Sequence, residues 1–353
     1  MKESFPTRRT ALASLAGLAA GTLLAGGARA QTPPLHGLID VHHHFYPPQF
    51  NAAANAYGAK HGQPPIGGPV GAWTPDRTLA EMDASGIAVA VLSLSSFSGV
   101  WFDQPRLAWP ALARACNEYA AGMMRDHPGR FGLFATLPMP DVDASLKEIA
   151  YALDTLHADG IGIPTSWGDS WPGEAAYAPV WSELDRRGAI VVFHPMAPNC
   201  CSGLPIGNVH DSYLEYPYDT GRAVESLLFS GTLLKYRNVR WTFCHAGGPI
   251  PVMAGRIATL SRFLSHDVAT IAPDGVEAEL KRLYYDTANA TYAPSMAALL
   301  ALVPPSQIMF GTDYPYVSGK INVDNLVARN LPSATLAAIA NGNAQRLIPR
   351  LRG

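Results

Sequence analysis

Four strand-like hydrophobic runs of this chain end in histidine or aspartate side chains. The side chains at these ends are His42 and His44, His194, His245 and Asp313. The carboxyl ends of the strands of a parallel barrel meet on one face, and barrel enzymes carry their chemistry there. Four such ends in sequence order predict a parallel α/β fold in which these side chains converge, although any one of the histidines alone would also fit an ordinary buried residue.

The first run, residues 38–41, leads into three consecutive histidines. Because side chains alternate between the two faces of a strand, His42 and His44 should share one face and His43 should occupy the other. Two imidazoles on one face can bind a single cation. A histidine-rich surface loop is the alternative for this stretch taken alone.

The rest of the chain alternates between strand and helix patterns. We expect strands over residues 38–42, 88–94, 130–136, 160–163, 190–194, 239–245, 282–286 and 307–311. We expect helices over residues 78–85, 107–127, 143–159, 178–187, 219–230 and 249–264. Eight strands separated by helices predict a single (β/α)₈ TIM barrel over residues 31–353. The connections 45–75 and 195–218 are longer than a barrel needs, so we expect lids or substrate walls there.

Residues 1–30 have the pattern of an export signal. Arg8 and Arg9 precede an uncharged run over residues 11–28, and Ala28-Arg29-Ala30 fits a small-residue cleavage site. The paired arginines favour twin-arginine export of a periplasmic protein that begins at Gln31. A general secretory signal is one alternative. An uncleaved membrane anchor is another, but the glycine- and alanine-rich run is only weakly apolar, which argues against it.

Removal of this segment makes the chain mildly acidic. Residues 1–30 contain four of the 26 basic residues and one of the 28 acidic residues. The 22 basic and 27 acidic residues that remain give a net charge of −5. A mildly acidic domain without a basic cluster argues against nucleic acid and anionic membranes as partners. We therefore expect a small molecule as the partner.

Three histidines and one carboxylate form a ligand set that suits Zn²⁺ and also allows Mn²⁺ or another divalent ion. The members of this set are His42, His44, His194 and Asp313. A catalytic ion keeps one coordination position for water or substrate. His245 should lie close to that position, either as a further ligand or as an acid or base. We expect no organic cofactor.

Two residue types that related metal enzymes require are absent from this chain at the expected positions, which reduces the number of reactions it could catalyse. The strand expected over residues 160–163 runs into Pro164 and Thr165 and carries no lysine or glutamate that could bridge two ions. No acid stands three residues after His194, where zinc deaminases of this architecture place a catalytic glutamate. These absences argue against a two-metal hydrolase and against a deaminase.

Six short motifs, spread over nearly the whole mature chain, resemble those of one enzyme family. They are Ile-Asp-Val-His-His-His-Phe at 39–45, Asn-Glu-Tyr at 117–119, Pro-Gly-Arg-Phe-Gly at 128–132, Phe-His-Pro at 193–195, His-Ala-Gly-Gly at 245–248 and Phe-Gly-Thr-Asp-Tyr-Pro at 310–315. The chain resembles the amidohydrolase-2 family, whose best-known type is aminocarboxymuconate-semialdehyde decarboxylase. Within that family it is most similar to the 6-methylsalicylate decarboxylase group.

The resemblance implies a barrel of the amidohydrolase type with roles for individual residues. The implied metal ligands are His42, His44, His194 and Asp313. His245 is implied as the residue that orders a water on the ion. The resemblance also implies a homodimer in which Arg256, eleven residues after His245, reaches the partner's site and binds the substrate carboxylate. The export signal departs from the intracellular decarboxylases of this pattern, so the physiological substrate stays open.

Three functions fit these features. The first, which we favour, is a metal-dependent decarboxylase of a hydroxylated aromatic or related unsaturated carboxylic acid. In it His245 or a water on the ion helps to move a proton to the ring carbon as CO₂ leaves. The second is a mononuclear metallohydrolase of a lactone, ester or amide, and the third is an exported metal-binding protein. Five aromatic residues could wall a substrate pocket, although each also fits ordinary packing: Trp101, Trp167, Trp171, Tyr314 and Tyr316.

Overall fold

The computed structural model of the protein describes residues 35–62, 64–95, 108–196, 200, 209–265 and 267–352. These residues belong to one compact unit that begins at Leu35. The expected export signal, residues 1–30, lies outside the described residues.

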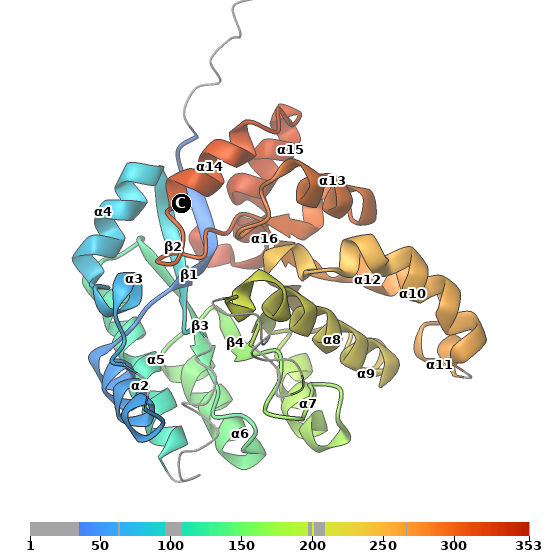
Figure 1. Cartoon of the computed structure of the whole chain (residues 1–353), viewed down its shortest axis with the longest axis horizontal. Coiled ribbons are helices and arrows are strands. Elements are labelled where there is room, and N and C mark those ends of the chain that lie inside the picture. The colour runs from blue at the N-terminus through green and yellow to red at the C-terminus, as the bar shows by residue number, and fades with distance from the viewer. Residues whose placement is uncertain are drawn as a thin grey trace, which may run out of the picture. The chain divides into compact units, whose positions relative to one another are not determined.

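Eight parallel strands follow one another around a single sheet in sequence order (Figure 1). They are β1 (Leu38–His44), β2 (Ile87–Ser93), β3 (Phe131–Thr136), β4 (Gly160–Pro164), β5 (Ile190–His194), β6 (Arg240–Phe243), β7 (Tyr284–Asp286) and β8 (Ile308–Met309). The segment after β8 meets β1 and closes the sheet, since the Val41 N–H donates to the Phe310 carbonyl at 3.0 Å and the His44 N–H donates to the Tyr314 carbonyl at 2.8 Å. This arrangement confirms the predicted (β/α)₈ barrel.

Helices connect the strands and cover the outside of the barrel (Figure 1). The helices that precede β5 are α2 (Pro48–Lys60), α3 (Gly68–Gly71), α4 (Pro75–Ser85), α5 (Trp109–Asp126), α6 (Val142–Ala150) and α7 (Ala178–Arg186). Those that follow β5 are α8 (Glu215–Phe229), α9 (Thr232–Lys235), α10 (Ile250–Leu264), α11 (Val268–Ile271), α12 (Val276–Arg282), α13 (Ala293–Leu302), α14 (Gly319–Val327), α15 (Ser333–Ala337) and α16 (Asn343–Leu347). Strands β1, β3 and β5 are buried along their whole length, as parallel strands are when helices cover the barrel.

The connection 45–75, expected to be a long loop, contains two helices, α2 and α3. The buried face of α2 consists of Phe50, Ala54 and Gly58, which recur every four residues. Because two of these three side chains are small or absent, the hydrophobic pattern that marks a helix is weak there. In the connection 195–218, α8 already begins at Glu215, and residues 197–199 and 201–208 lie outside the described residues.

Three expected elements end at least two residues earlier than predicted, and one of them is the strand expected over residues 307–311, which ends as β8 at Met309. The helix expected over residues 143–159 stops as α6 at Ala150 and continues as a π-helical turn, Tyr151–Thr155. The strand expected over residues 239–245 ends at Phe243, and a short 3₁₀ turn, η4 (His245–Gly247), follows it. His245 therefore stands in a turn and not at the end of a strand.

An aromatic cluster packs β5 and β6 against α7. The rings of Phe193 and Phe243 stack with centroids 5.0 Å apart, and Trp181 meets Trp241 edge to face at 5.3 Å. Both phenylalanines are completely buried, and replacing such a ring by alanine costs roughly 3–5 kcal/mol. This cluster fixes the two strands that carry His194 and lead into the turn of His245.

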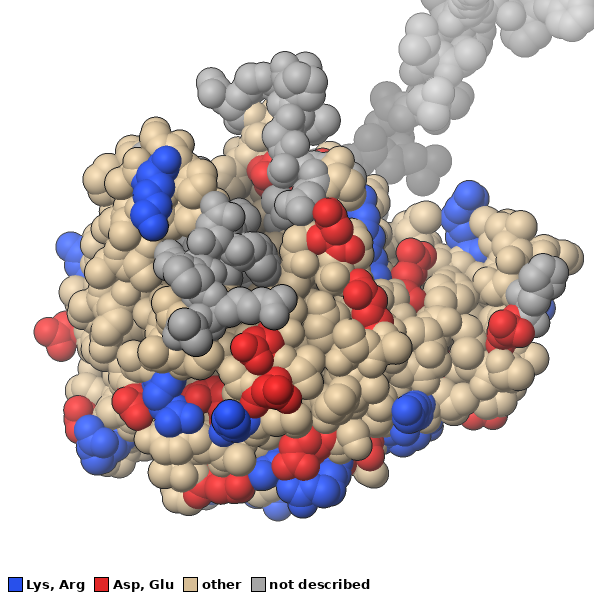
Figure 2. All heavy atoms as spheres, turned by 90° about the horizontal axis from the view of Figure 1, so that it is seen from below, with Lys and Arg blue, Asp and Glu red and all other residues tan. Residues whose placement is uncertain are grey.

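No helix in the described part of the chain is long and apolar enough to cross a membrane. On the face shown in Figure 2, Lys and Arg side chains lie interspersed with Asp and Glu side chains. This face therefore lacks the continuous basic surface that nucleic-acid binding requires.

Candidate metal centre

The barrel brings the four predicted ligands together at the carboxyl ends of its strands. His42 and His44 share one face of β1, and their Nε2 atoms lie 3.1 Å apart. Oδ1 of Asp313 lies 3.0 Å from Nε2 of His44 and 3.3 Å from Nε2 of His42. The ring of His194, the last residue of β5, has its centroid 4.6 Å from that of His44 and 5.2 Å from that of His42. All four side chains are almost completely buried.

Each of the three histidines is anchored through its Nδ1 atom. The Nδ1–H of His44 donates to the Ser93 carbonyl at 3.2 Å, and that of His194 donates to the carbonyl of the next residue at 3.1 Å. Nδ1 of His42 lies 2.9 Å from Oδ2 of Asp286. A neutral ring that donates from Nδ1 to an oxygen keeps a lone pair on Nε2. In that neutral form, the three Nε2 atoms are available as metal ligands.

A divalent cation fits these residues. Nε2 of His194 is a buried nitrogen that has no hydrogen-bond partner among the described residues. Buried polar atoms nearly always have a partner, and an orphan often marks a missing water or ion. Imidazole nitrogens and a carboxylate oxygen around one point are ligands that Zn²⁺ accepts and that Mn²⁺ also tolerates.

The ionisation of His194, His44 and Asp313 also favours a cation. Burial, and next the charges of His44 and His42, hold the pKa of His194 well below its usual value, and burial likewise lowers the pKa of His44. Burial by itself would raise the pKa of Asp313, but hydrogen bonds with His245, His42 and His44 hold that pKa well below its usual value. Neutral histidines and an ionised carboxylate are the forms that bind metal ions.

A strained turn places His245 beside the donor atoms of the proposed ligands. The φ angles of His245 and Ala246 are 54° and 57°, in the left-handed region that residues with a Cβ disfavour. A Cβ at Gly248, which follows with a φ of 58°, would approach the Pro217 carbonyl oxygen to 2.1 Å, so only glycine fits there. The turn places Nε2 of His245 3.5 Å from Oδ2 of Asp313.

His245 lies close enough to serve either role that the sequence suggested. The donor atoms of His42, His194, His245 and Asp313 lie within 4.8 Å of one another. The side chain of His245 is 14% exposed, whereas that of His42 is 1% exposed. A more open histidine beside buried ligands fits an acid or base, and the distances also fit a further ligand.

His43 points to the opposite side of β1, as predicted. Its Nδ1 atom lies 2.8 Å from Oδ2 of Asp40, and its ring stacks on Tyr314 with centroids 4.6 Å apart. The Thr312 hydroxyl donates to the same Asp40 oxygen at 2.5 Å. This group holds the segment before Asp313 against β1, so His43 has a structural role.

Comparisons with known proteins agree with this geometry. The sequence profile of the amidohydrolase family matches residues 39–350. The chain belongs to the amidohydrolase family. It is 36% identical over 327 residues to the 6-methylsalicylic acid decarboxylase of Penicillium expansum, a match that covers 89% of this chain and 97% of that relative. The family resemblance predicted from the motifs is thereby confirmed.

Two solved structures share the barrel of this amidohydrolase. The 2,6-dihydroxybenzoate decarboxylase from Rhizobium superposes with a TM-score of 0.76 at 21% identity, covering 90% of this chain and all of that one. A dihydroxybenzoic acid decarboxylase from Polaromonas sp. JS666, solved with bound manganese and the inhibitor 2-nitroresorcinol, superposes with a TM-score of 0.75 at 21% identity, covering 90% and 98% of the two chains. These structures confirm the fold, and the relative in Penicillium expansum supports the predicted carboxy-lyase class and not the hydrolase alternative.

Sequence reasoning missed two residues that contact the predicted ligands. Asp286, the last residue of β7, bonds to His42, and Asn289 donates from Nδ2 to Oδ2 of Asp313 at 2.6 Å. Asp286 ends a strand-like run just as the predicted ligands do, so the same rule would have found it. Asn289 stands in the following loop with a φ of 51°, and no spacing in the sequence marks it.

Of the five aromatic residues that could wall a pocket, Tyr316 lies beside the metal centre. Its ring centroid is 5.8 Å from that of His44, and its hydroxyl accepts a hydrogen bond from Tyr46 at 2.7 Å and donates to Ser95 at 3.1 Å. Tyr314 instead stacks on His43, away from the ligands. Trp167 packs on Tyr177, Trp171 donates to Asp219, and Trp101 lies outside the described residues.

Arg256 is exposed on α10, and the structure joins its side chain to none of the described site residues. Val252 and Met253, which precede it by about one turn, are 75% and 37% exposed, and Phe263, two turns later, is 77% exposed. At a helical repeat these four side chains share one face of α10. Arg256 thus stands within an exposed, largely apolar helix face and apart from the metal centre of its own chain.

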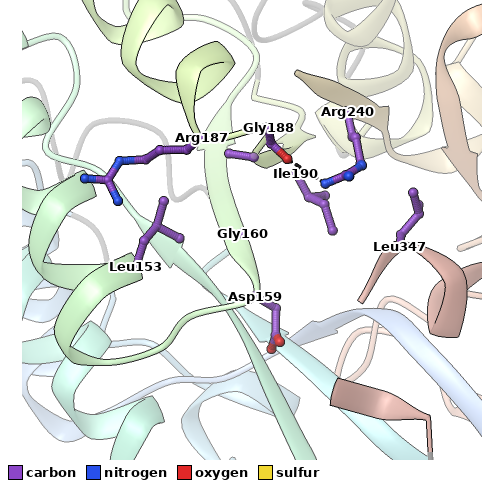
Figure 3. Close-up of a pocket in the computed structure, with 9 residues that line it drawn as sticks. Leu153, Asp159, Gly160, Arg187, Gly188, Ile190, Arg240 and Leu347 are labelled. Atoms are coloured by element: carbon purple, nitrogen blue, oxygen red, sulfur yellow. Dashed lines mark hydrogen bonds between the residues drawn. The ribbon is translucent and has the colours of Figure 1, made fainter. Parts of the chain in front are cut away.

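Two cavities lie at the end of the barrel opposite the histidines. One, of about 300 Å³, is lined by Arg187, Arg240 and the starts of β4 and β5, and the other, of about 490 Å³, is lined by the starts of β6 and β7. Arg240 points toward the Gly188 carbonyl and donates to it at 2.5 Å (Figure 3), and Arg187 donates to Asp154 at 2.6 Å. Because these charged groups already have partners, we assign the first cavity to the structural end of the barrel.

Proposed function

We propose that this amidohydrolase is a metal-dependent, non-oxidative decarboxylase of a hydroxylated aromatic acid similar to 6-methylsalicylate. One observation carries the proposal: three histidines and Asp313 converge at the carboxyl ends of a barrel in a chain 36% identical to a 6-methylsalicylic acid decarboxylase. A metallohydrolase of a lactone, ester or amide would use similar ligands, but the relatives give it no support.

The reaction needs a proton and a stabilising charge. Loss of CO₂ breaks the bond between the ring carbon and the carboxylate, and the electron pair stays on the ring carbon, which then takes up a proton. No oxidant or organic cofactor is required. When bound, a divalent ion would supply Lewis acidity toward the oxygen atoms of the substrate. His245, beside Asp313 and on the open side of the ligands, can hold the proton and deliver it to the ring carbon.

We propose His42, His44, His194 and Asp313 as the ligands, with Zn²⁺ or Mn²⁺ as the ion. The imidazole-rich set favours zinc. The manganese bound by the decarboxylase from Polaromonas supports the second choice. Elemental analysis of the purified protein distinguishes these ions, and a protein that retains no divalent ion would contradict the proposal.

The substrate class is tested with a panel of salicylates, resorcylates and lactones and with metal-loaded protein. A decarboxylase releases one CO₂ for each phenol formed and takes up no net water. We expect the highest kcat/KM for a salicylate with a substituent beside the carboxylate. Hydrolysis of a lactone without CO₂ release from any acid in the panel would instead establish the hydrolase.

We further propose that two copies of the chain form a dimer through the exposed face of α10. Val252, Met253 and Phe263 would pack between the copies, which removes their apolar surface from water. Arg256 would then reach the partner's site, where its planar guanidinium suits a substrate carboxylate through two hydrogen bonds. The exposed apolar residues on both sides of Arg256 support this assembly.

We also propose that the protein is exported by the twin-arginine route and matures near Gln31. The Arg8-Arg9 pair, the uncharged run and the Ala28-Arg29-Ala30 site support this proposal. The test replaces both arginines by lysine and follows the protein in the periplasmic fraction. Normal periplasmic arrival of the double variant would rule out the twin-arginine route and leave the general secretory route.

A further inference from the structure

Asp286 is a buried carboxylate that none of the roles above explains. It is the last residue of β7, at the same end of the barrel as the metal ligands, and it is 0% exposed. A buried charge must be compensated by hydrogen bonds or by an opposite charge. The partners that compensate it therefore show what the carboxylate does.

The two oxygens of Asp286 serve different partners. Oδ2 lies 2.9 Å from Nδ1 of His42. Oδ1 accepts from the backbone N–H of His245 at 2.9 Å and from that of Ala288 at 3.0 Å. One carboxylate thus touches the ring of a proposed metal ligand and the backbone of the proposed acid or base.

The contact with Oδ2 decides which nitrogen His42 offers to the centre. An ionised carboxylate can only accept hydrogen bonds, so the proton of a neutral His42 must be on Nδ1. The lone pair is then on Nε2, the atom that lies 3.1 Å from Nε2 of His44 and 3.3 Å from Oδ1 of Asp313. Without the carboxylate, neither the tautomer nor the ring orientation is fixed.

The contact with Oδ1 holds the turn that carries His245. Both His245 and Ala246 have positive φ angles, which residues with a Cβ rarely adopt without support from their surroundings. The hydrogen bond from the His245 N–H to Asp286 ties the first residue of this turn to the end of β7. The position of the His245 ring relative to the proposed ligands therefore depends on Asp286, the same side chain that orients His42.

Cys244 completes a trio with His42 and Asp286, whose donor atoms lie within 4.8 Å of one another. The trio does not form a second ion site, because Nδ1 of His42 and Oδ2 of Asp286 already bond to each other and Oδ1 already accepts two N–H groups. The thiol packs against this bonded pair, and Cys244 is 1% exposed.

We infer that Asp286 is a positioning residue that couples the metal ligand His42 to His245, fixing the donor nitrogen of the first and the place of the second. This inference rests on the proposed metal centre. It assigns Asp286 no contact with the substrate.

The test compares Asp286→Asn with the unmodified protein. An asparagine has the same shape, and its oxygen can still accept from the His245 N–H. Its NH₂ group would then face Nδ1 of His42 and donate to it, which moves the ring proton to Nε2 and removes the lone pair that the ion needs. We expect the Kd for Mn²⁺ to rise 10–100-fold and the visible absorption spectrum of the Co²⁺-loaded protein to change.

Asp159→Asn is the matched control. The Asp159 side chain is 3% exposed and, like Asp286, accepts a backbone N–H, that of Leu133 at 2.8 Å, but it lies at the opposite end of the barrel. We expect this variant to lose thermal stability and to keep the Kd for Mn²⁺ and the Co²⁺ spectrum. If both variants weaken Mn²⁺ binding equally, Asp286 acts through general stability and the inference is wrong.

The outcomes separate this inference from the proposed function. If the unmodified protein binds no Mn²⁺ or Co²⁺, the metal centre itself is refuted. If it binds them and Asp286→Asn binds them equally well with an unchanged Co²⁺ spectrum, only the role of Asp286 is refuted. Should Asp286→Asn fail to fold, ¹⁵N NMR of the histidines in the unmodified Zn²⁺-loaded protein decides the matter. His42 must then show a proton on Nδ1 and none on Nε2, and the reverse would overturn the inference.

Discussion

The Nε2 atoms of His42 and His44 lie 3.1 Å apart, on two side chains that leave the same face of β1. Two ring nitrogens at this distance cannot both carry a proton without repulsion. A cation within reach of both lone pairs would remove that conflict, and Asp313 and His194 could hold the same ion.

Replacing His42 and His44 by alanine should therefore abolish metal binding. We expect the ion content of the double variant to fall from one per chain to none, measured by elemental analysis after dialysis. His43→Gln is the control, because His43 lies between the two ligands but faces Asp40 and Tyr314. That variant should lose stability and retain its ion. An equal ion content in all three proteins would place the metal elsewhere.

His245 should matter more for turnover than for metal retention. The proposed ligands are His42, His44, His194 and Asp313 and do not include His245, and removal of a general acid or base typically lowers the rate 10²–10⁴-fold. We expect His245→Asn to lower kcat by that factor with its metal content unchanged. If ion and activity fall in the same proportion, His245 is a further ligand.

Gly311→Ala should weaken metal binding although Gly311 is not itself a proposed ligand. A Cβ at Gly311 would lie 2.8 Å from the Cβ of His42 and 3.3 Å from that of Asp286, so β1 and β7 must shift to admit it. We expect a rise of roughly tenfold or more in the Kd for Mn²⁺, measured by calorimetric titration. In the control Gly122→Ala the added Cβ makes only an ordinary 3.5 Å contact with Arg125, so the affinity should not change. An unchanged Kd in Gly311→Ala would show that the barrel absorbs the methyl group without moving His42.

Metal affinity should rise with pH. Burial alone would lower the pKa of His42, but the charge of Asp286 and hydrogen bonds to the carboxylates of Asp286 and Asp313 hold it well above its usual value. The metal-free ring therefore keeps its second proton at neutral pH, and an ion must displace that proton to reach Nε2. We expect the Kd for Mn²⁺ to fall steadily from about pH 6 to about pH 8, with proton release visible as a buffer-dependent binding enthalpy. A Kd that is constant over this range would show that His42 is already neutral.

Mixing two inactive variants should restore part of the enzymatic activity if Arg256 of one chain binds the substrate in the partner's site. In a mixed dimer of His245→Asn and Arg256→Ala, one of the two sites holds both the original histidine and the original arginine. We expect partial recovery of activity after the dimers have exchanged subunits, which mass spectrometry can verify. Exchange without recovery would assign Arg256 to its own chain or to no site.

Replacing Val252 and Phe263 by serine tests the same interface through the oligomeric state of the protein. These residues flank Arg256 on the exposed face of α10, and serine removes the apolar surface that would hold two copies together. We expect a monomer in sedimentation analysis with the metal content preserved. A dimer of undiminished stability would place the interface on another surface.

The amino-acid sequence by itself determined the parts of this protein that depend on local order. The two-residue period of a strand placed His42 and His44 on one face and His43 on the other, and the rule that parallel strands end on a common face joined them to His194 and Asp313. These inferences needed no knowledge of contacts, because alternation and strand direction are properties of the backbone. The same local rules failed for α2, whose buried face is made largely of alanine and glycine.

Only the tertiary structure decided how these side chains are held. His42 bonds to Asp286, 244 residues away in the chain, and the same carboxylate ties down the His245 turn with its left-handed backbone. Neither contact leaves a periodic trace in the sequence, because a hydrogen-bond partner depends on which strand ends become neighbours when the barrel closes. The positions of the proposed ligands could therefore be read from the sequence, whereas the contacts that orient them became visible only when β1, β6 and β7 were brought side by side.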